Sequence, residues 1–264
     1  MINYYLPPIR RRRLIHLRDL LYELVIRDIK VRYKGSSLGI VWSLLNSLAQ
    51  LRIFGFLFRS ALGRHMANYP TYIFSGIIVW SWFQTSLIMA CETITSNREL
   101  VKRPGFPAII LPPVTIATSL IDFIIAFPIL LIFIVTSGGK LTSALVALPM
   151  IMTLQFLLTL GLAYLVATFQ VTFRDTKHLL NVLLRLGFFL TPIFYDLTIV
   201  PAQYQWLYAL NPLVHLLALY RAVLLNGELP EPMPLLIISV LAAVLLPLGY
   251  KTFINARYRF MEEL

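Results

Sequence analysis

Six long apolar stretches alternate with short polar segments along the chain of 264 residues. A helix needs about 20 predominantly apolar residues to cross the hydrocarbon core of a bilayer. The stretches are continuous and do not alternate with a period of two, which argues against a membrane β-barrel. The pattern therefore predicts an all-α integral membrane protein with six transmembrane helices, at residues 38–58, 69–92, 106–135, 141–169, 179–200 and 233–254.

Two further segments have helical patterns but are unsuited to spanning a bilayer. In residues 14–31, leucine and other aliphatic residues recur at spacings of three and four with charged residues between them. This periodicity predicts an amphipathic helix that lies on the membrane surface. Residues 196–232 are polar, rich in aromatic residues and broken by prolines. They are expected to form one or two short helices at or dipping into the interface, with a plain surface loop as the alternative.

Composition and charge agree with a membrane protein. Apolar residues make up 58% of the chain and charged residues 13%, against about 25% charged residues in soluble domains, which excludes a soluble enzyme. Residues 1–37 hold nine of the 23 lysines and arginines, and eight more lie after the second and fourth spans and in the C-terminal tail. The positive-inside rule then places both termini in the cytoplasm, in agreement with an even number of spans. Because these charges flank spans, membrane lipids explain them and no nucleic-acid partner is expected.

Polar side chains inside spans are costly, so each is a candidate functional group. Amides can pair with the hydroxyls of a sugar chain, and aromatic rings can stack on its apolar faces. Two of the spans each carry a row of such side chains along one face, which we call a polar stripe. The two stripes indicate either two walls of a polar pathway or the hydrogen bonds that join packed helices. Helical spacing places one stripe on the first span, at Ser43, Asn46, Ser47, Gln50 and Phe54, and a second on the fifth span, at His178, Asn181, Arg185, Phe188, Phe189 and Pro192.

Catalytic and metal-binding patterns do not stand out. The four histidines form no pair at metal-ligand spacing, and Cys91 is the single cysteine, so no metal site is expected. Residues 137–140 lack the full pattern of a phosphate-binding loop. Arg52 is expected to have a partner, because a lone arginine in lipid would be expensive; Asp122 and Glu92 are candidates, and the sequence does not choose between them. Asp122 is also the strongest candidate for proton coupling.

Two cytoplasmic loops have the character of docking segments. Residues 96–107 begin with a helix-start signal and end at prolines, which predicts one short amphipathic helix. Residues 173–177 form the second loop. Ordinary solvated loops are the alternative for both.

Several motifs follow one another as they do in type-2 ABC exporter permeases for polysaccharides, the family that the chain resembles. These permeases carry lipid-linked O-antigen, capsule or teichoic acid, and the absence of an extended periplasmic domain favours O-antigen. Ser47 departs from the family, which often has proline there, so a less kinked first span is expected. The motifs are RDIKVRYKGSSLGIVWSLLN at 27–46, YPTYIFSG at 69–76, NRELVK at 97–102 with FP at 106–107 and LP at 111–112, FRD at 173–175 and NPLVH at 211–215.

The resemblance implies a homodimeric permease of the bacterial inner membrane that is not itself an enzyme. Its partners would be two copies of a nucleotide-binding ATPase subunit, which hold ATP and Mg, so that this chain needs no cofactor. The substrate would be an undecaprenyl-linked polysaccharide. The alternatives are an ATPase-independent membrane transferase and a proton-coupled transporter that uses Asp122. The expected division is a cytoplasmic segment at 1–37, one transmembrane domain at 38–254 and a cytoplasmic tail at 255–264.

The resemblance also assigns residues to roles, with residues 196–225 as a re-entrant periplasmic gate. The implied translocation pathway, between spans one and five, contains Trp42, Ser43, Asn46, Ser47, Gln50, Phe54, Asn181, Arg185, Phe188 and Phe189. The implied ATPase-coupling helix contains Asn97, Arg98, Glu99, Leu100, Val101, Lys102 and Arg103. The carrier pyrophosphate would meet Arg27, Arg32 and Lys34, and the gate would include Tyr195, Trp206, Asn211 and Pro212.

Overall fold

The computed structural model describes residues 8–36, 38–39, 41–61 and 68–263, and this part of the chain contains helices and no strand. These described residues form ten α-helices, joined by short 3-10 and π turns. They are α1 Pro8–Tyr33, α2 Val41–Ala61, α3 Tyr69–Ser96, α4 Arg98–Val101, α5 Leu111–Thr136, α6 Leu148–Thr172, α7 Thr176–Leu190, α8 Gln205–Ala209, α9 Pro212–Arg221 and α10 Pro232–Glu263.

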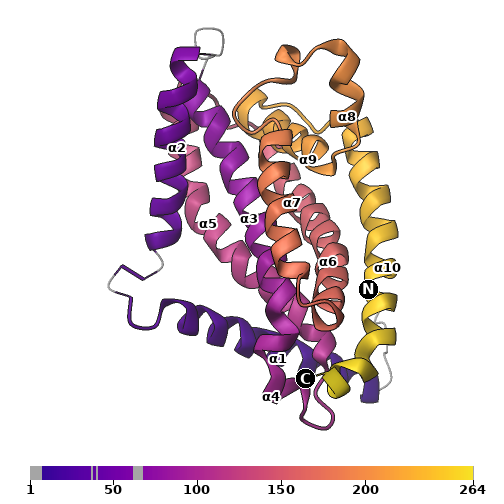
Figure 1. Ribbon diagram of the computed structural model, residues 1–264. Coiled ribbons are helices and arrows are strands. Elements are labelled where there is room, and N and C mark those ends of the chain that lie inside the picture. The colour runs from indigo at the N-terminus through magenta and orange to yellow at the C-terminus, as the bar shows by residue number, and fades with distance from the viewer. Residues whose placement is uncertain (1–7, 37, 40, 62–67, 264) are drawn as a thin grey trace.

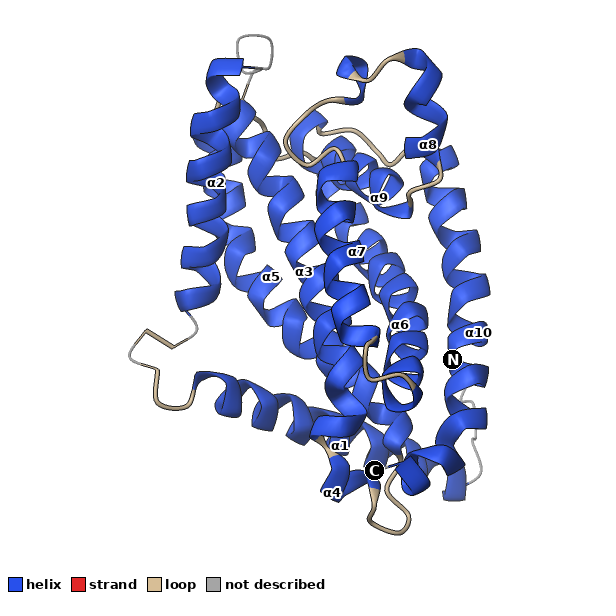
Figure 2. Cartoon of the chain, in the orientation of Figure 1, coloured by secondary structure: helices blue, strands red, loops and turns tan. Residues whose placement is uncertain are grey.

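The helices form one bundle around α3, which packs against α2, α5, α6 and α7. α10 runs along α6 on one side, while α2 stands at the opposite edge (Figure 1). α1 crosses one end of the bundle, next to α4 and the last turns of α10, and we refer to this as the α1 end (Figure 2). α8 and α9 cover the other end, the α8 end.

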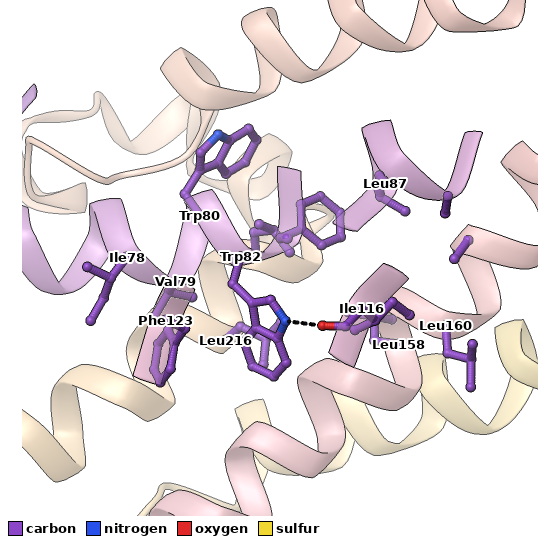
Figure 3. Packing of buried hydrophobic residues seen from close by; sticks show 14 of the residues in the cluster. Ile78, Val79, Trp80, Trp82, Leu87, Ile116, Phe123, Leu158, Leu160 and Leu216 are labelled. Carbon is purple, nitrogen blue, oxygen red and sulfur yellow. Dashed lines mark hydrogen bonds between the residues drawn. The ribbon is translucent and has the colours of Figure 1, made fainter. Parts of the chain in front are cut away.

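The core of the bundle follows the buried face of α3. Ile73, Phe74 and Ile77 are fully buried there. Trp82 points toward α5, where its indole Nε1 donates a hydrogen bond of 3.3 Å to the carbonyl oxygen of Ile116 (Figure 3). Since a buried tryptophan N–H needs a partner, this bond fixes the register of α3 against α5.

Four helical segments in the described residues are long and apolar enough to cross a membrane: Tyr69–Ser96, Ala108–Thr136, Ser143–Thr172 and Pro232–Phe260. A fifth span is possible if the bent pair Ala202–Ala209 and Pro212–Asn226 counts as one. The chain is thus a multi-pass membrane protein. The first and fifth predicted spans correspond to α2 and α7, which are outside this set, so the count of six stays a prediction.

The predicted fifth span, 179–200, is wrong in its length. α7 ends at Leu190 and has 15 residues, which reach about 22 Å at 1.5 Å per residue and fall short of the roughly 30 Å of hydrocarbon. The helix stops because Pro192 disfavours helical geometry at Thr191 and offers no N–H of its own. Residues 191–196 are irregular.

The region between α7 and α10 forms short helices, so the surface-loop alternative is wrong. Two 3-10 turns and α8 precede α9, and the chain bends by 93° between the segments Ala202–Ala209 and Pro212–Asn226. Asn211 caps α9, because its Oδ1 accepts a hydrogen bond from the backbone N–H of Leu213. How deep this region enters a bilayer stays a prediction.

The two predicted helices at the α1 end are confirmed as helices. α1 contains the predicted 14–31 segment, and Leu24 of α1 is buried in the described core. α4 lies within the predicted 96–107 segment, and its buried residue Val101 anchors it. Arg98 and Glu99 of α4 are exposed, so α4 presents charged side chains outward from the bundle.

Candidate functional site

The polar stripe of α2 faces α3 and α5. Its members Ser43, Asn46, Ser47 and Gln50 line a cavity of about 220 Å³ whose other walls come from these two helices. Part of their hydrogen-bonding capacity is used within α2, because Gln50 donates to Asn46 at 3.4 Å and Ser47 donates to the carbonyl of Ser43 at 3.2 Å. Within one chain, this stripe belongs to a polar cavity inside the bundle.

The polar stripe of α7 points differently. Arg185 is exposed and Asn181 is half-buried, and neither side chain has a hydrogen-bond partner within residues 8–36, 41–61 and 68–263. Phe189 is 53% exposed, and Trp42, a predicted pathway residue at the start of α2, is 56% exposed. The two stripes therefore do not face each other along their length in a single chain.

The stripes meet at their aromatic ends. The rings of Phe54 on α2 and Phe188 on α7 lie 5.5 Å apart. Phe194 joins them: its ring stacks on Phe54 at 5.5 Å with an interplanar angle of 5°, and lies 5.9 Å from Phe188 and 6.0 Å from Phe189. Helical spacing could not find Phe194, because α7 ends before it. Its position two residues after Pro192 was the available signal.

The predicted coupling segment, residues 97–103, is bonded to two helices at the α1 end. Asn97, which precedes α4, accepts a hydrogen bond of 2.7 Å from Arg27 of α1 and donates one of 2.9 Å to the carbonyl of Thr93 on α3. Leu100 is half-buried, whereas Lys102 and Arg103 are exposed. A movement of α4 would therefore be felt by both α1 and α3.

The start of α7 is tied to the same end of α3. Lys177 Nζ forms an ion pair of 2.6 Å with Glu92 Oε1. The buried amide of Gln170 on α6 holds the turn before α7, because its Oε1 accepts from the backbone N–H of Lys177 at 2.8 Å and its Nε2 donates to the carbonyl of Arg174 at 3.2 Å. Glu92 lies five residues before Asn97, so α7 and the coupling segment share one stretch of α3.

A cleft of about 830 Å³ opens at the α1 end between α1, α2, α3 and α5. Arg27 and Arg32 line it, together with Asp28, Glu92 and other residues. Arg27 pairs with Asp28 at 2.7 Å, and Arg32 pairs with an acid of α5. Lys34 is exposed and is not among the lining residues. Two of the three cations assigned to a carrier pyrophosphate are thus already paired in this structure.

Asp122 is the acid that pairs with Arg32, at 2.7 Å, and it also accepts a hydrogen bond of 2.9 Å from the hydroxyl of Tyr33. Burial, and then the charge of Asp122, raise the pKa of the Tyr33 phenol above its ordinary value, so Tyr33 stays a donor. The two acids that the sequence offered as candidate partners of Arg52 are paired elsewhere, Asp122 with Arg32 and Glu92 with Lys177. Arg52 lies on the exposed side of α2 beside Ala49 and Phe56.

Replacing Asp122 with alanine is expected to free the end of α1 from α5. The two side chains of the pair are about a quarter exposed, so we expect the contact between α1 and α5 to lose about 1–2 kcal/mol of stabilisation. The loss should be smaller for Asp122→Asn. Hydrogen exchange of residues 27–33 measures the release. Asp19→Ala is the matched control, because the Arg18–Asp19 pair is solvent-exposed. A proton-coupled transporter predicts in addition that Asp122→Asn abolishes transport.

The predicted gate residues lie together at the α8 end, apart from one. The hydroxyl of Tyr195 donates to the carbonyl of Phe189 at 3.0 Å and lies 3.1 Å from the hydroxyl of Tyr208. Asn211 donates from Nδ2 to Thr191 Oγ1 at 3.0 Å, and Pro212 begins α9. Trp206 of α8 is 62% exposed and does not line the pocket that Tyr195, Asn211 and Pro212 share.

Metal chemistry has no candidate among the described residues, where no group of three or more His, Cys, Asp and Glu side chains is arranged to hold a metal ion. Cys91 is buried in the core.

Known proteins are similar to this chain over most of its length. A family described as "ABC-2 type transporter" matches residues 19–225. The chain is 34% identical over 255 residues to the O-antigen export system permease protein RfbA of Myxococcus xanthus, covering 96% of this chain and 98% of that protein. It is 28% identical over 250 residues to the RfbA protein of Klebsiella pneumoniae, covering 94% and 96%. It is 29% identical over 248 residues to the polysialic acid transport protein KpsM of Escherichia coli, covering 91% and 92%.

Proposed function

Because the chain belongs to the ABC-2 type transporter family, as the permease subunit of an ABC exporter, we propose that it moves an undecaprenyl-linked polysaccharide, O-antigen in the first place, across the bacterial inner membrane. The observation that carries the substrate class is the near full-length match to permeases named for O-antigen export. The match to a polysialic acid transport protein supports polysaccharide more broadly.

The working assembly is a homodimer with two copies of a separate ATPase subunit, which bind ATP and Mg. Both termini lie in the cytoplasm. The clustering of lysine and arginine in residues 1–37 supports this orientation. The apolar residues Leu179, Val182, Leu183 and Leu186 of α7 are exposed in the single chain, which supports a second copy or lipid against this helix.

The stroke begins at residues 97–103. Closure of the ATPase pushes on α4 and the turn after it, where the exposed charges Arg98, Glu99 and Arg103 support a docking role. The bond between Arg27 and Asn97 carries the movement into α1. The same movement reaches α7 through the end of α3, where Glu92 pairs with Lys177 of α7. α7 then moves relative to α2, and the pathway opens between the two helices.

The carrier pyrophosphate enters at the cleft of the α1 end. Lys34 is exposed and free to meet it first. Arg27 and Arg32 line the cleft, and they can exchange their present carboxylate partners for phosphate oxygens, since the arginine fork suits both anions. The stripes of α2 and α7 then offer amides to sugar hydroxyls and aromatic rings to sugar faces.

Exchanging the charges of the Glu92–Lys177 pair tests the link between the ATPase and α7. Glu92→Lys alone places two cations together and is expected to lower export per ATP hydrolysed severalfold, while ATP hydrolysis itself continues. The double variant Glu92→Lys/Lys177→Glu restores the attraction and is expected to recover most of the coupling. Export and hydrolysis are measured on the same preparation. A double variant as defective as the single one would contradict the link.

The function itself is tested by depletion in the native cell. Without this chain, the lipid-linked polysaccharide should accumulate on the cytoplasmic leaflet and disappear from the cell surface, as measured by surface labelling of intact and lysed cells. Unchanged surface polysaccharide would overturn the proposal.

No observation favours the transferase or the proton-coupled transporter. The proton-coupled transporter needs Asp122 as a titrating group, and here it is held by Arg32 and Tyr33. The transferase needs Asp122 or Asp196 as a reactive group, and Asp196 accepts a hydrogen bond from the backbone N–H of Thr198.

A further inference from the structure

The irregular segment after α7 is held in place by side chains. Four consecutive carbonyl oxygens, at residues 192–195, each accept a hydrogen bond from a side chain of α3 or α9. Arg221 donates to Pro192 at 2.8 Å and to Ile193 at 3.1 Å. Tyr69 donates to residue 194 at 2.8 Å, and Tyr72 donates to residue 195 at 3.0 Å. Irregular backbone at membrane depth needs such partners.

Arg221 is the centre of this arrangement, which we term the carbonyl clamp (Arg221, Tyr69 and Tyr72). Its Nη1 also donates to the hydroxyl of Tyr72 at 2.7 Å, and its guanidinium carbon lies 3.5 Å from the centre of the Tyr72 ring. The clamp therefore joins three elements that are far apart in sequence: α3, the segment after α7, and α9.

Arg221 forms no ion pair with a carboxylate in the described residues, and its buried Nε makes no hydrogen bond there. A buried cation held mainly by neutral acceptors is costly. An intramembrane or buried charge of this kind is a functional candidate by default, and the unused donor is available to a partner in a second arrangement of the segment.

Gly76 on α3 leaves the space that the clamp needs. A Cβ at this position would lie 3.0 Å from the Ile193 side chain, 3.1 Å from the Ile193 carbonyl oxygen and 3.1 Å from Arg221 Nη2. Gly76 thus faces both Arg221 and Ile193, which are bonded to each other. A larger side chain at this position would push Arg221 and the segment apart without removing a hydrogen-bonding group.

The clamp fixes the aromatic contact between α2 and α7. Tyr69 donates to the carbonyl of Phe194, and the ring of the same residue lies against both Phe54 and Phe188. This is the point where the two candidate pathway helices meet, at the end away from α1 and α4. The position of the Phe194 ring therefore depends on bonds made by α3 and α9, neither of which carries a pathway stripe.

We infer that Arg221 is the positioning residue of the outer closure of the pathway: it holds residues 192–195 so that Phe194 bridges α2 and α7, and the pathway opens at this end when the clamp releases these carbonyls. The inference rests on the proposed function, since it requires a pathway between α2 and α7. It assigns the closure to a bonded network beneath α8, where the sequence indicated only Tyr195, Trp206, Asn211 and Pro212.

The test is the resting leak of the purified permease complex, reconstituted without nucleotide in vesicles of phosphatidylethanolamine and phosphatidylglycerol that hold carboxyfluorescein. Arg221→Lys keeps the charge but cannot reach Tyr72, Pro192 and Ile193 together. Losing one charge-assisted bond shifts an equilibrium by about tenfold or more, so we expect the leak to rise about tenfold. Tyr72→Phe and Gly76→Ala, both on α3, weaken the same clamp and are expected to raise the leak as well.

Arg257→Lys and Tyr258→Phe are the matched controls, because both residues are exposed on the last turns of α10. Melting temperature and complex assembly are followed in parallel, since a structural role alone would lower both without a leak. Leak in the clamp variants with normal assembly supports the inference. The inference is overturned if the three clamp variants assemble normally and leak no more than the wild type. It is also overturned if all three variants leak only when the complex fails to assemble. The leak assay uses no ATP, so a failure of ATP-driven export would refute the proposed function separately.

Discussion

Replacing Gly161 with leucine is expected to separate α6 from α10 and to destabilise the bundle by about 3 kcal/mol or more, the upper end of the cost of overpacking. A Cβ on Gly161 would lie 2.6 Å from the carbonyl carbon of Leu245, and one on Gly249 would meet the carbonyl of Gly161. Backbone cannot move aside as a flexible side chain can, and small residues are what lets two membrane helices approach this closely.

The unfolding of purified protein in detergent measures this effect. Gly55→Leu on α2 is the matched control, because nothing lies within 4 Å of a Cβ built there, and it should unfold like the wild type. Equal stability of the two leucine variants would show that α6 and α10 are not packed backbone to backbone.

The second large effect concerns the coupling segment. Replacing Glu99, Leu100 and Arg103 together with alanine is expected to weaken binding of the ATPase subunit at least about 100-fold, because three interface side chains of about 1 kcal/mol each are lost. Two of these side chains are exposed and Leu100 is half-buried, so the bundle itself should stay folded.

Binding of the purified ATPase subunit to the permease in detergent measures this loss. The matched control replaces Glu228, Leu229 and Glu231 at the α8 end, which are also two charges and a leucine and are all exposed. That variant should bind normally. Equal loss in both variants would point to unfolding, and no loss in the coupling variant would contradict the docking role of α4.

Much of the architecture could be predicted from the sequence, because apolar length and helical periodicity are local signals. The long helices α3, α5, α6 and α10 lie where the apolar stretches predicted them, and α1 and α4 lie within or around the predicted surface helices. The end of α7 was not predicted, because the apolar run continues past Pro192 to residue 200. Pro192 was the local signal that the helix ends there.

The site was less predictable, because it depends on which helices become neighbours. Helical spacing grouped Asn46 with Gln50 correctly, yet it could not tell that this face meets α3 and α5. Charge alone could not choose the partner of Asp122, which proved to be Arg32, 90 positions away in the chain. The carbonyl clamp joins residues 69 and 72 to residues 192–195 and 221, a grouping that no local pattern contains.

The central claim is that this chain is the membrane half of an ATP-driven exporter. Purification of the chain from native membranes, followed by an ATPase assay on everything that accompanies it, tests the claim most directly. We predict a stoichiometric nucleotide-binding subunit with ATPase activity. A chain that purifies alone, and that neither binds nor stimulates an ATPase, would contradict the account.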